Sequence, residues 1–163
     1  MRKESGFSML EILVSMIIIM IGVLGIAGMQ LLAINNTEVA RYQSLAALLA
    51  SSMAAEIQGN VAYWNAPFAI SFTGTTITGG PSGGTNCQTT VCTASQMAGY
   101  TLKNWVQAVT NTLPGAQGSI SCSNGTPAVC TLILTWSEKT VASLGTPTGS
   151  TGSQSYKTLV TVQ

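Results

Sequence analysis

Residues 6–35 decide the fold of this chain, and they read GFSMLEILVSMIIIMIGVLGIAGMQLLAIN. The stretch is rich in Ile, Leu, Met and Val, has no proline, and carries one charged side chain, that of Glu11. From there to Glu38 the chain has no other charge. About twenty consecutive apolar residues form a helix long enough to cross the hydrocarbon core of a bilayer. The stretch therefore predicts a transmembrane helix.

The residues before this helix indicate its orientation. Arg2 and Lys3 precede the apolar stretch, and no basic cluster follows it closely. Because basic residues favour the cytoplasmic side, we expect the N-terminus in the cytoplasm and the rest of the chain in the periplasm or outside the cell. A secretory signal peptide has an apolar region of only about 7–15 residues and a small-residue cleavage site behind it. This stretch is longer and has no such site, so a plain signal anchor is the simplest alternative.

Beyond Asn36 the composition changes from uniformly apolar to amphipathic. Apolar residues recur at spacings of three and four, the period of a helix with one buried face. They are Leu45, Leu48, Leu49, Met53 and Ile57. Polar residues occupy much of the remaining surface, namely Glu38, Arg41, Ser44, Ser51 and Ser52. Gly59 and Asn60 tolerate the left-handed conformation, so we expect the helix to continue from the membrane to residue 58.

The part of the chain after residue 59 has the pattern of a small α+β domain. Residues 73–86 and 144–155 are rich in Gly, Thr, Ser and Pro without periodicity, which predicts loops. Thr93 and Gln96 form a capping box before a helical pattern that ends at Pro114. Three further segments have the composition of strands: 119–122, 130–136 and 157–162.

These strands are expected to form a three-stranded antiparallel sheet that packs on the long helix, with one further helix. Asn124-Gly125 is a turn signal between the first two strands. Alternation along 130–136 assigns side chains to the two faces of the sheet. Leu132, Leu134 and Trp136 are expected on one face, and Thr131, Ile133 and Thr135 on the other. Trp105 and Trp136 are interpreted as core residues rather than as parts of a binding site.

Composition excludes several classes of function. Only 7% of the residues are charged and the net charge is +1, so no basic surface for nucleic acid is expected. Histidine and aspartate are both absent, which excludes Ser–His–Asp and Cys–His catalysis. The same absence excludes a zinc site that uses histidine. We therefore expect no enzymatic activity, no metal and no cofactor.

Four cysteines lie downstream of the apolar stretch, at 87, 92, 122 and 130. An even number outside the cytoplasm favours disulfides, and the spacings do not fit the C-x-x-C knuckles of metal sites. Pairing Cys87 with Cys92 and Cys122 with Cys130 is the most economical of three connectivities. The spacing alone leaves the other two open.

Glu11 is an acidic residue within an apolar helix, and such residues are functional by default. Cleavage between Gly6 and Phe7 would remove the basic head and leave a charged α-amino group on Phe7. This amine lies about one helical turn from Glu11. Between chains, a pair formed by one subunit's amine and another subunit's Glu11 would fix the axial register of two apolar helices, while apolar packing supplies the affinity.

The G-F-S-x-L-E junction followed by a long apolar helix resembles the class III signal of type IV prepilins and type II secretion pseudopilins. In that family a membrane-embedded prepilin peptidase cuts after the glycine and methylates the new N-terminal phenylalanine. The resemblance implies these events for Gly6 and Phe7, and a role in assembly for Glu11. It also implies the type IV pilin fold.

Beyond the junction, the chain resembles the minor pilins of the PilV type, known as type IV pilus modification proteins. The matching segments are IGVLGIAGMQ at 21–30, the run from Cys92-Thr93 through Tyr100 to Trp105, Leu113-Pro114-Gly115, and LTWSE at 134–138. The resemblance implies a subunit that helps to prime and assemble the pilus and is incorporated at or near its tip. It associates the chain with fimbriae, for which cell adhesion, twitching motility and DNA uptake are the alternative uses.

The same resemblance implies partners and a location. The partners would be other minor pilins, the major pilin, the inner-membrane assembly platform and the prepilin peptidase. The protein would cross the inner membrane once, with its globular domain in the periplasm, before it enters the extracellular pilus. The implied domains are a leader at 1–6, a transmembrane and assembly helix at 7–34, an amphipathic continuation at 35–58, and a globular domain at 59–163.

One feature departs from the family pattern. Major pilins carry a helix-breaking proline in the stem, whereas this chain has glycine at 22, 25 and 28. These glycines either soften the helix so that it can extend or pack closely in a fibre, or reflect ordinary close packing of helices in a bilayer.

Three other functions are weighed against the minor pilin. A minor pseudopilin of type II secretion shares the same N-terminal signal. A tip adhesin would use the Gly/Thr/Ser loops as a binding surface. A membrane-anchored enzyme is disfavoured by the missing His and Asp.

Overall fold

The computed structural model describes residues 8–81, 84–139 and 151–162. The leader, Gly6 and Phe7 lie outside the described residues, as does the first part of the expected loop at 144–155. The chain divides into two compact units, Met1–Glu38 and Val39–Gln163. One helix, α1 (Met9–Gly59), contributes residues to both units.

Helix α1 begins where the backbone amides of Glu11 and Ile12 donate to the carbonyl oxygen of Ser8, at 2.9 and 3.4 Å. Hydroxyl side chains along the helix donate to carbonyl oxygens one turn earlier. Ser15 Oγ donates to Ile12 O and Thr37 Oγ1 to Ala33 O, both at 2.8 Å. These local bonds allow hydroxyl groups to occur in an apolar helix without an external partner.

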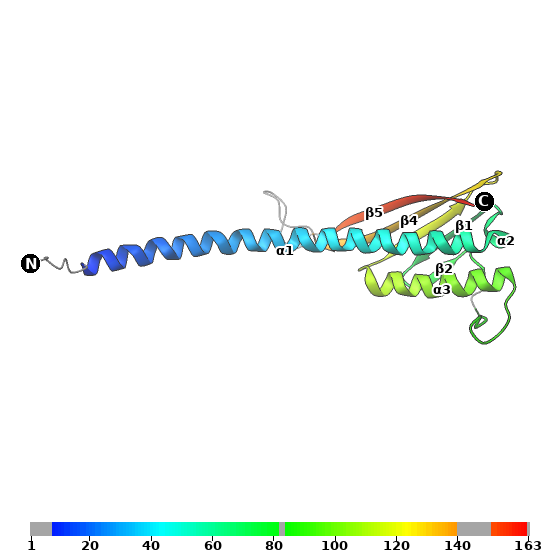
Figure 1. Cartoon of the computed structure of the whole chain (residues 1–163), viewed down its shortest axis with the longest axis horizontal. Coiled ribbons are helices and arrows are strands. Elements are labelled where there is room, and N and C mark those ends of the chain that lie inside the picture. Colours follow the sequence, from blue (N-terminus) through cyan, green and yellow to red (C-terminus); the bar gives the residue numbers. More distant parts are fainter. Residues whose placement is uncertain (1–7, 82–83, 140–150, 163) are drawn as a thin grey trace, which may run out of the picture. The chain divides into compact units, whose positions relative to one another are not determined.

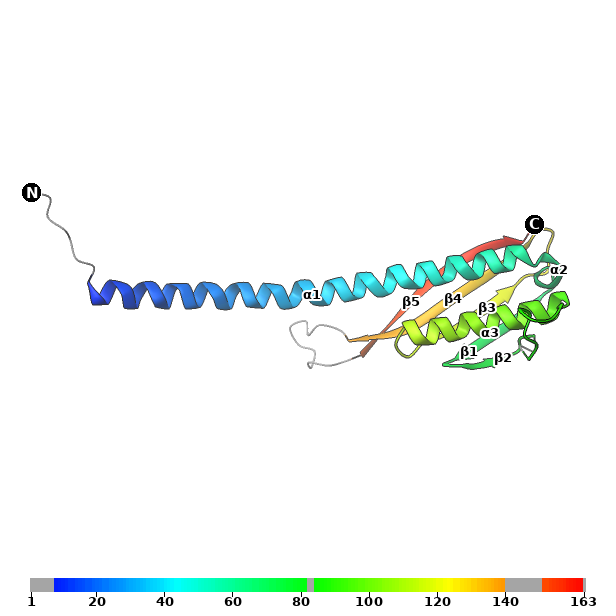
Figure 2. The same cartoon turned by 60° about the horizontal axis from the view of Figure 1, so that its bottom comes forward.

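The second unit combines the later part of α1 with two shorter helices and one sheet. The five strands are antiparallel and follow the order β2-β1-β3-β4-β5. The elements after α1 are α2 (Val61–Trp64), β1 (Phe68–Thr73), β2 (Thr76–Thr78), α3 (Ala94–Thr112), β3 (Gln117–Cys122), β4 (Ala128–Lys139) and β5 (Thr151–Val162). In this unit α1 and α3 lie on the same face of the sheet (Figures 1 and 2). The fold is therefore α+β, as expected.

The expectation of three strands was wrong, because the sheet has five. Strand β1 was missed although it alternates, with Ile70 and Phe72 buried and their neighbours Ala69 and Ser71 exposed. Strand β2 lies within the expected loop 73–86. It returns along β1 after a tight turn at Gly74, whose φ of 55° favours glycine.

Strand β5 is also longer than expected. It starts at Thr151, inside the expected loop 144–155, because its polar first residues pair with the last residues of β4. The register between these two strands is continuous from Ala128↔Val162 to Lys139↔Thr151. Backbone pairing with β4 therefore makes residues 151–155 a strand, although their side chains are polar and show no apolar alternation.

Four of the five residues expected on the buried stripe of α1 contact the core, namely Leu45, Leu49, Met53 and Ile57, and Leu48 does not. Met53 and Ile57 are buried as expected, but Leu48 is 65% exposed. The buried face instead uses Ala46 and Ala50, and it follows spacings of four, three and four. A residue two positions after Ala46 lies about 200° around the helix, so Leu48 points away from the core.

The expected alternation of β4 is confirmed. Leu132, Leu134 and Trp136 are buried against the helices, whereas the side chains between them are partly exposed on the other face. Trp105 of α3 is buried as well, and its Nε1 donates to the carbonyl oxygen of Leu49 at 2.7 Å. Both tryptophans are core residues, and this bond ties α3 to α1.

The N-terminus of α3 has the expected capping box. The Thr93 hydroxyl accepts from the amide of Gln96 at 3.3 Å, and the Gln96 side chain accepts from the amide of Thr93 at 2.9 Å. An aromatic cluster of Tyr63, Trp64 and Phe68 lies at the same end of the domain, where Asn60 Nδ2 donates to Ala94 O at 2.8 Å, and its ring centroids are 5.0–5.7 Å apart. Burial raises the pKa of the Tyr63 phenol above its usual value.

Candidate functional site

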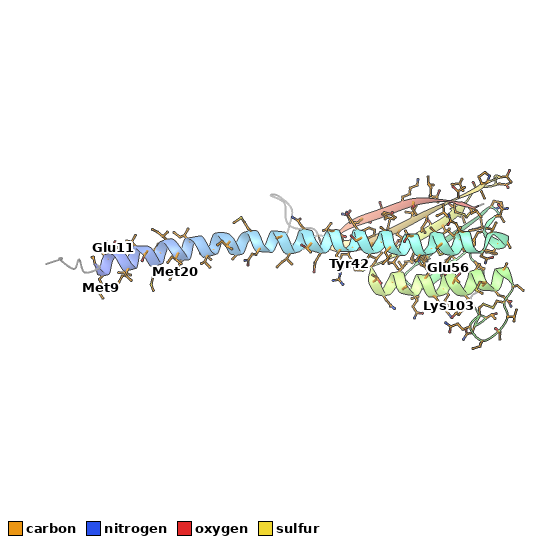
Figure 3. All side chains as sticks on the ribbon, in the orientation of Figure 1. Met9, Glu11, Met20, Tyr42, Glu56 and Lys103 are labelled. Atoms are coloured by element: carbon orange, nitrogen blue, oxygen red, sulfur yellow. A yellow bond between two sulfur atoms is a disulfide. The ribbon has the colours of Figure 1, made fainter. Side chains whose placement is uncertain are left out.

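The first part of α1 presents apolar side chains in every direction. The span Met9–Gln30 has a mean hydropathy of 2.7, and none of it is buried within the chain. Figure 3 shows the side chains of Met9, Glu11 and Met20 projecting from the ribbon of this span. Water strongly disfavours such a surface, so it has to be covered by lipid or by other helices. Its length and composition are consistent with a membrane anchor.

Glu11 lies in the first turn of α1 and is exposed among apolar neighbours, of which Leu10 and Ile12 are 70% and 50% exposed. Its position suits a negative charge, because the N-terminal end of a helix carries partial positive charge. Among residues 8–81, 84–139 and 151–162, no hydrogen bond or ion pair to its carboxylate is found.

The expected processing residues, Gly6 and Phe7, lie outside the described residues. The structure places Glu11 just after the start of the helix, three residues beyond Ser8. An α-amino group created at Phe7 would therefore belong to the same end of the molecule. This arrangement allows charge pairing between the ends of neighbouring helices.

Gly22, Gly25 and Gly28 lie on an open surface of α1. A Cβ atom added at any of the three would meet no atom within 4 Å. Nothing in the described part of the chain therefore requires glycine at these positions. Both interpretations of these residues, close approach of another helix and local softness of α1, stay predictions.

The cysteines form the two expected pairs, Cys87–Cys92 and Cys122–Cys130. The first bond closes a short loop before α3. The second joins residues that lie directly opposite each other on β3 and β4, and both of its cysteines are buried. Within the described part of the chain, no group of acidic, cysteine or histidine residues could hold a metal ion.

One polar pair in the core was missed by the sequence analysis. The indole Nε1 of Trp136 donates to Oε1 of Glu138 at 2.6 Å, and Glu138 is only 5% exposed. The two residues are two positions apart on β4 and so point to the same face of the sheet. Strand alternation could have revealed this, because it places an acid next to Trp136 on the inward face.

Comparison with known proteins defines the class of the N-terminal signal. Residues 1–27 match the family model described as the prokaryotic N-terminal methylation motif. No curated protein and no solved structure matches the chain. The chain thus carries a prepilin signal of the type IV pilin class. Its long apolar helix, followed by a helix and a small antiparallel sheet, matches the pilin fold.

Proposed function

We propose that this chain is a minor pilin that helps to prime and assemble a type IV pilus and is incorporated at or near the pilus tip. The observation that carries the proposal is the methylation motif at 1–27, combined with Glu11 in an apolar helix that the chain itself leaves uncovered. The similarity of the later segments to PilV-type minor pilins selects this role within the class.

The assembly step follows from charge and apolar area. The prepilin peptidase removes residues 1–6 and methylates the amine of Phe7, which stays positively charged. When the subunit moves from the bilayer into the filament, its apolar helix exchanges lipid for neighbouring helices. Glu11 then pairs with the Phe7 amine of a neighbouring subunit. Apolar packing does not fix the position along the helix, so the charge pair selects the axial register.

The proposed location and partners follow from this cycle. Before assembly the protein crosses the inner membrane once, with its N-terminus in the cytoplasm and its disulfide-bonded domain in the periplasm. Its partners are the other minor pilins, the major pilin and the assembly platform protein. It catalyses no reaction and is itself a substrate of the peptidase.

Mass spectrometry of the N-terminal peptide from purified filaments tests the proposal directly. We expect a chain that begins with N-methylated Phe7. An unprocessed Met1, or cleavage at another bond, would contradict the proposed processing and assembly.

The same signal occurs in pseudopilins of type II secretion, so a second measurement separates the two filaments. We expect peptides of this chain in pili sheared from the cell surface, and loss of surface pili when the gene is deleted. Loss of exoprotein secretion with normal piliation would instead identify a minor pseudopilin.

A further inference from the structure

The two edges of the sheet differ in how far they are protected from pairing with another chain. One edge is β2, which has only three residues. The other edge is β5, which is twelve residues long and pairs without interruption along β4. Among the described residues β5 has no second strand beside it.

Proteins usually protect a long edge strand with proline, a bulge or several charged side chains. Strand β5, TGSQSYKTLVTV, has no proline, and its one charged residue is Lys157. Its register with β4 contains no bulge. A row of backbone donors and acceptors therefore remains open to another extended chain.

The hydrogen bonding of β4 shows which residues of β5 face outward. The amide of Ser123 donates to the carbonyl oxygen of Val129 at 2.9 Å, so Val129 directs its backbone groups toward β3. Consecutive strand residues direct these groups to opposite sides, so Cys130 directs its own toward β5, where it is opposite Val160. Val160 pairs back to β4, and its two neighbours direct their N–H and C=O groups to the free edge.

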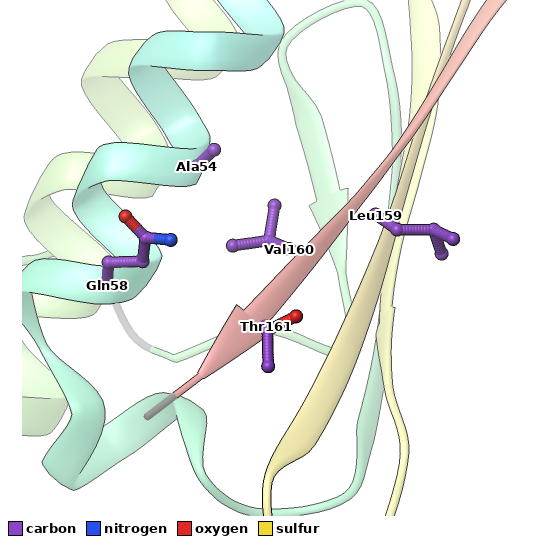
Figure 4. Close-up of a pocket in the computed structure, with 5 residues that line it drawn as sticks. All are labelled: Ala54, Gln58, Leu159, Val160 and Thr161. Atoms are coloured by element: carbon purple, nitrogen blue, oxygen red, sulfur yellow. The ribbon is translucent and has the colours of Figure 1, made fainter.

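These neighbours, Leu159 and Thr161, line a groove of about 490 Å³ between β5 and α1. Ala54 and Gln58 form the other wall (Figure 4). In this view both side chains point from α1 toward β5, whereas Leu159 points away from the helix. Small-molecule pockets are mostly apolar and aromatic, but this groove has no aromatic side chain and offers a strand backbone and an amide. Its lining suits an extended peptide.

We propose that the free edge of β5 binds an extended strand of a different polypeptide, which adds to the sheet along the groove between β5 and α1. The added strand forms main-chain hydrogen bonds with Leu159 and Thr161, and Gln58 can bond to its backbone from the other side. The small side chain of Ala54 leaves room for the strand.

The exposed side chains of β5 define the chemistry of this partner. Lys157 and Leu159 lie on the same face of the sheet, and Leu159 is 64% exposed. The added strand is expected to carry an acidic and an apolar residue two positions apart, next to these side chains. Glu138 is the one acid in the described strands of this chain, and it is buried in β4 between two paired strands. A second copy therefore does not offer this pattern.

Photocrosslinking from the groove tests the proposal on the full chain in the cells that produce it. The photoreactive residue p-benzoylphenylalanine replaces Gln58, which is exposed on α1 and is not part of the core. After irradiation, mass spectrometry identifies the crosslinked partner residue. We expect an adduct to a different polypeptide, within an extended segment that has an acidic and an apolar residue at alternate positions.

Two substitutions at residue 161 separate strand addition from simple proximity. Thr161→Pro removes an outward amide but no bond to β4, and we expect about tenfold less adduct because proline cannot donate to the added strand. Thr161→Ala keeps the amide, so its yield should stay within about twofold of the parent. Formation of both disulfides and an unchanged thermal transition show that each variant is folded.

Lys157→Glu tests the partner's charge without touching the backbone, so it also serves if Thr161→Pro fails to fold. We expect the adduct to decrease about threefold or more through like-charge repulsion across the strands. No adduct, an adduct only to a second copy, or equal yields with proline and alanine at 161 would each overturn the proposal. The inference depends on β5 and on Ala54 and Gln58 of α1, and not on the N-terminal signal, so it can fail while the N-terminal processing stands.

Discussion

Helix α1 contains two stretches that place similar apolar side chains in opposite surroundings. Met29 in the first unit is 66% exposed, whereas Met53 in the second unit is fully buried. The first stretch is apolar on all sides and has no preferred face. The second stretch has an apolar face of small and medium residues, which matches the sheet of its own domain.

The comparison shows that a position in α1 can be apolar for either of two reasons. In the second unit the pattern serves folding, because each buried position has neighbours within the same chain. In the first unit the composition serves an environment outside the chain, either lipid or other helices. Substitutions in the first unit should therefore change incorporation into filaments, whereas substitutions in the second unit should change the stability of the domain.

The largest expected effect concerns Glu11. Glu11→Ala should lower the amount of protein in sheared filaments about tenfold or more, because two apolar helices then lack the charge pair that fixes their register. Glu56→Ala is the matched control, since Glu56 is an exposed acid of α1 in the second unit. Immunoblots of filament and membrane fractions provide the measurement. Equal incorporation of both variants would remove the assembly role of Glu11.

Matched leucine substitutions test the difference in packing. Leu102→Ala should destabilise the domain by about 3 kcal/mol, because Leu102 is fully buried in the core. Leu24→Ala should leave the unfolding transition of the domain unchanged, because Leu24 is 73% exposed in the first unit. Denaturant unfolding of both full-length variants in detergent compares them. A similar loss of stability in both would show that the units are not independent.

The two disulfides should differ in their effect on stability. Replacing Cys122 and Cys130 together with alanine should cost about 2–3 kcal/mol, because the bond links two strands within the core. Replacing Cys87 and Cys92 together should cost less, since that bond closes a short loop outside the sheet. Thermal unfolding of the two double variants measures the order, and the reverse order would contradict this expectation.

The smallest effect is expected at the start of α3. Thr93→Ala removes the hydroxyl half of the capping box and should cost about 1 kcal/mol. Thr110→Ala, in the last turns of the same helix, should change stability by less than about 0.5 kcal/mol, since alanine favours a helix and the lost bond is local. Denaturant midpoints compare the two. A greater loss of stability in Thr110→Ala than in Thr93→Ala would contradict the expected order.

Strong local patterns made much of the fold predictable. The capping box at Thr93 located α3, and the alternation from Thr131 to Trp136 assigned both faces of β4. Of the missed segments, β2 and the start of β5 depend on pairing, whereas β1 has an alternating pattern of its own. Strand β2 has three residues and β5 begins with polar ones, so their extended form follows from the neighbouring strand rather than from their own composition.

The candidate site was predictable only in part. Glu11 could be identified because a single acid interrupts an apolar stretch, but its proposed partner belongs to another subunit. The exposure of Leu48 could not be foreseen, because a helical period identifies a stripe without fixing which of two adjacent faces meets the sheet. The groove beside β5 required the strand order, which no local pattern contains.

The packing of α1 in the domain also bears on when the domain can fold. Trp105 bonds to a carbonyl group 56 residues earlier in the chain, and the last strand supplies Val160 and Val162 to the same core. Contacts between residues so distant in sequence form late and slowly. In the proposed membrane-anchored state, insertion of the apolar helix needs only local bonds, whereas the core is incomplete until β5 has been synthesised. On this proposal the domain folds after the helix has been inserted, so its unfinished sheet edges stay at one membrane surface during that interval.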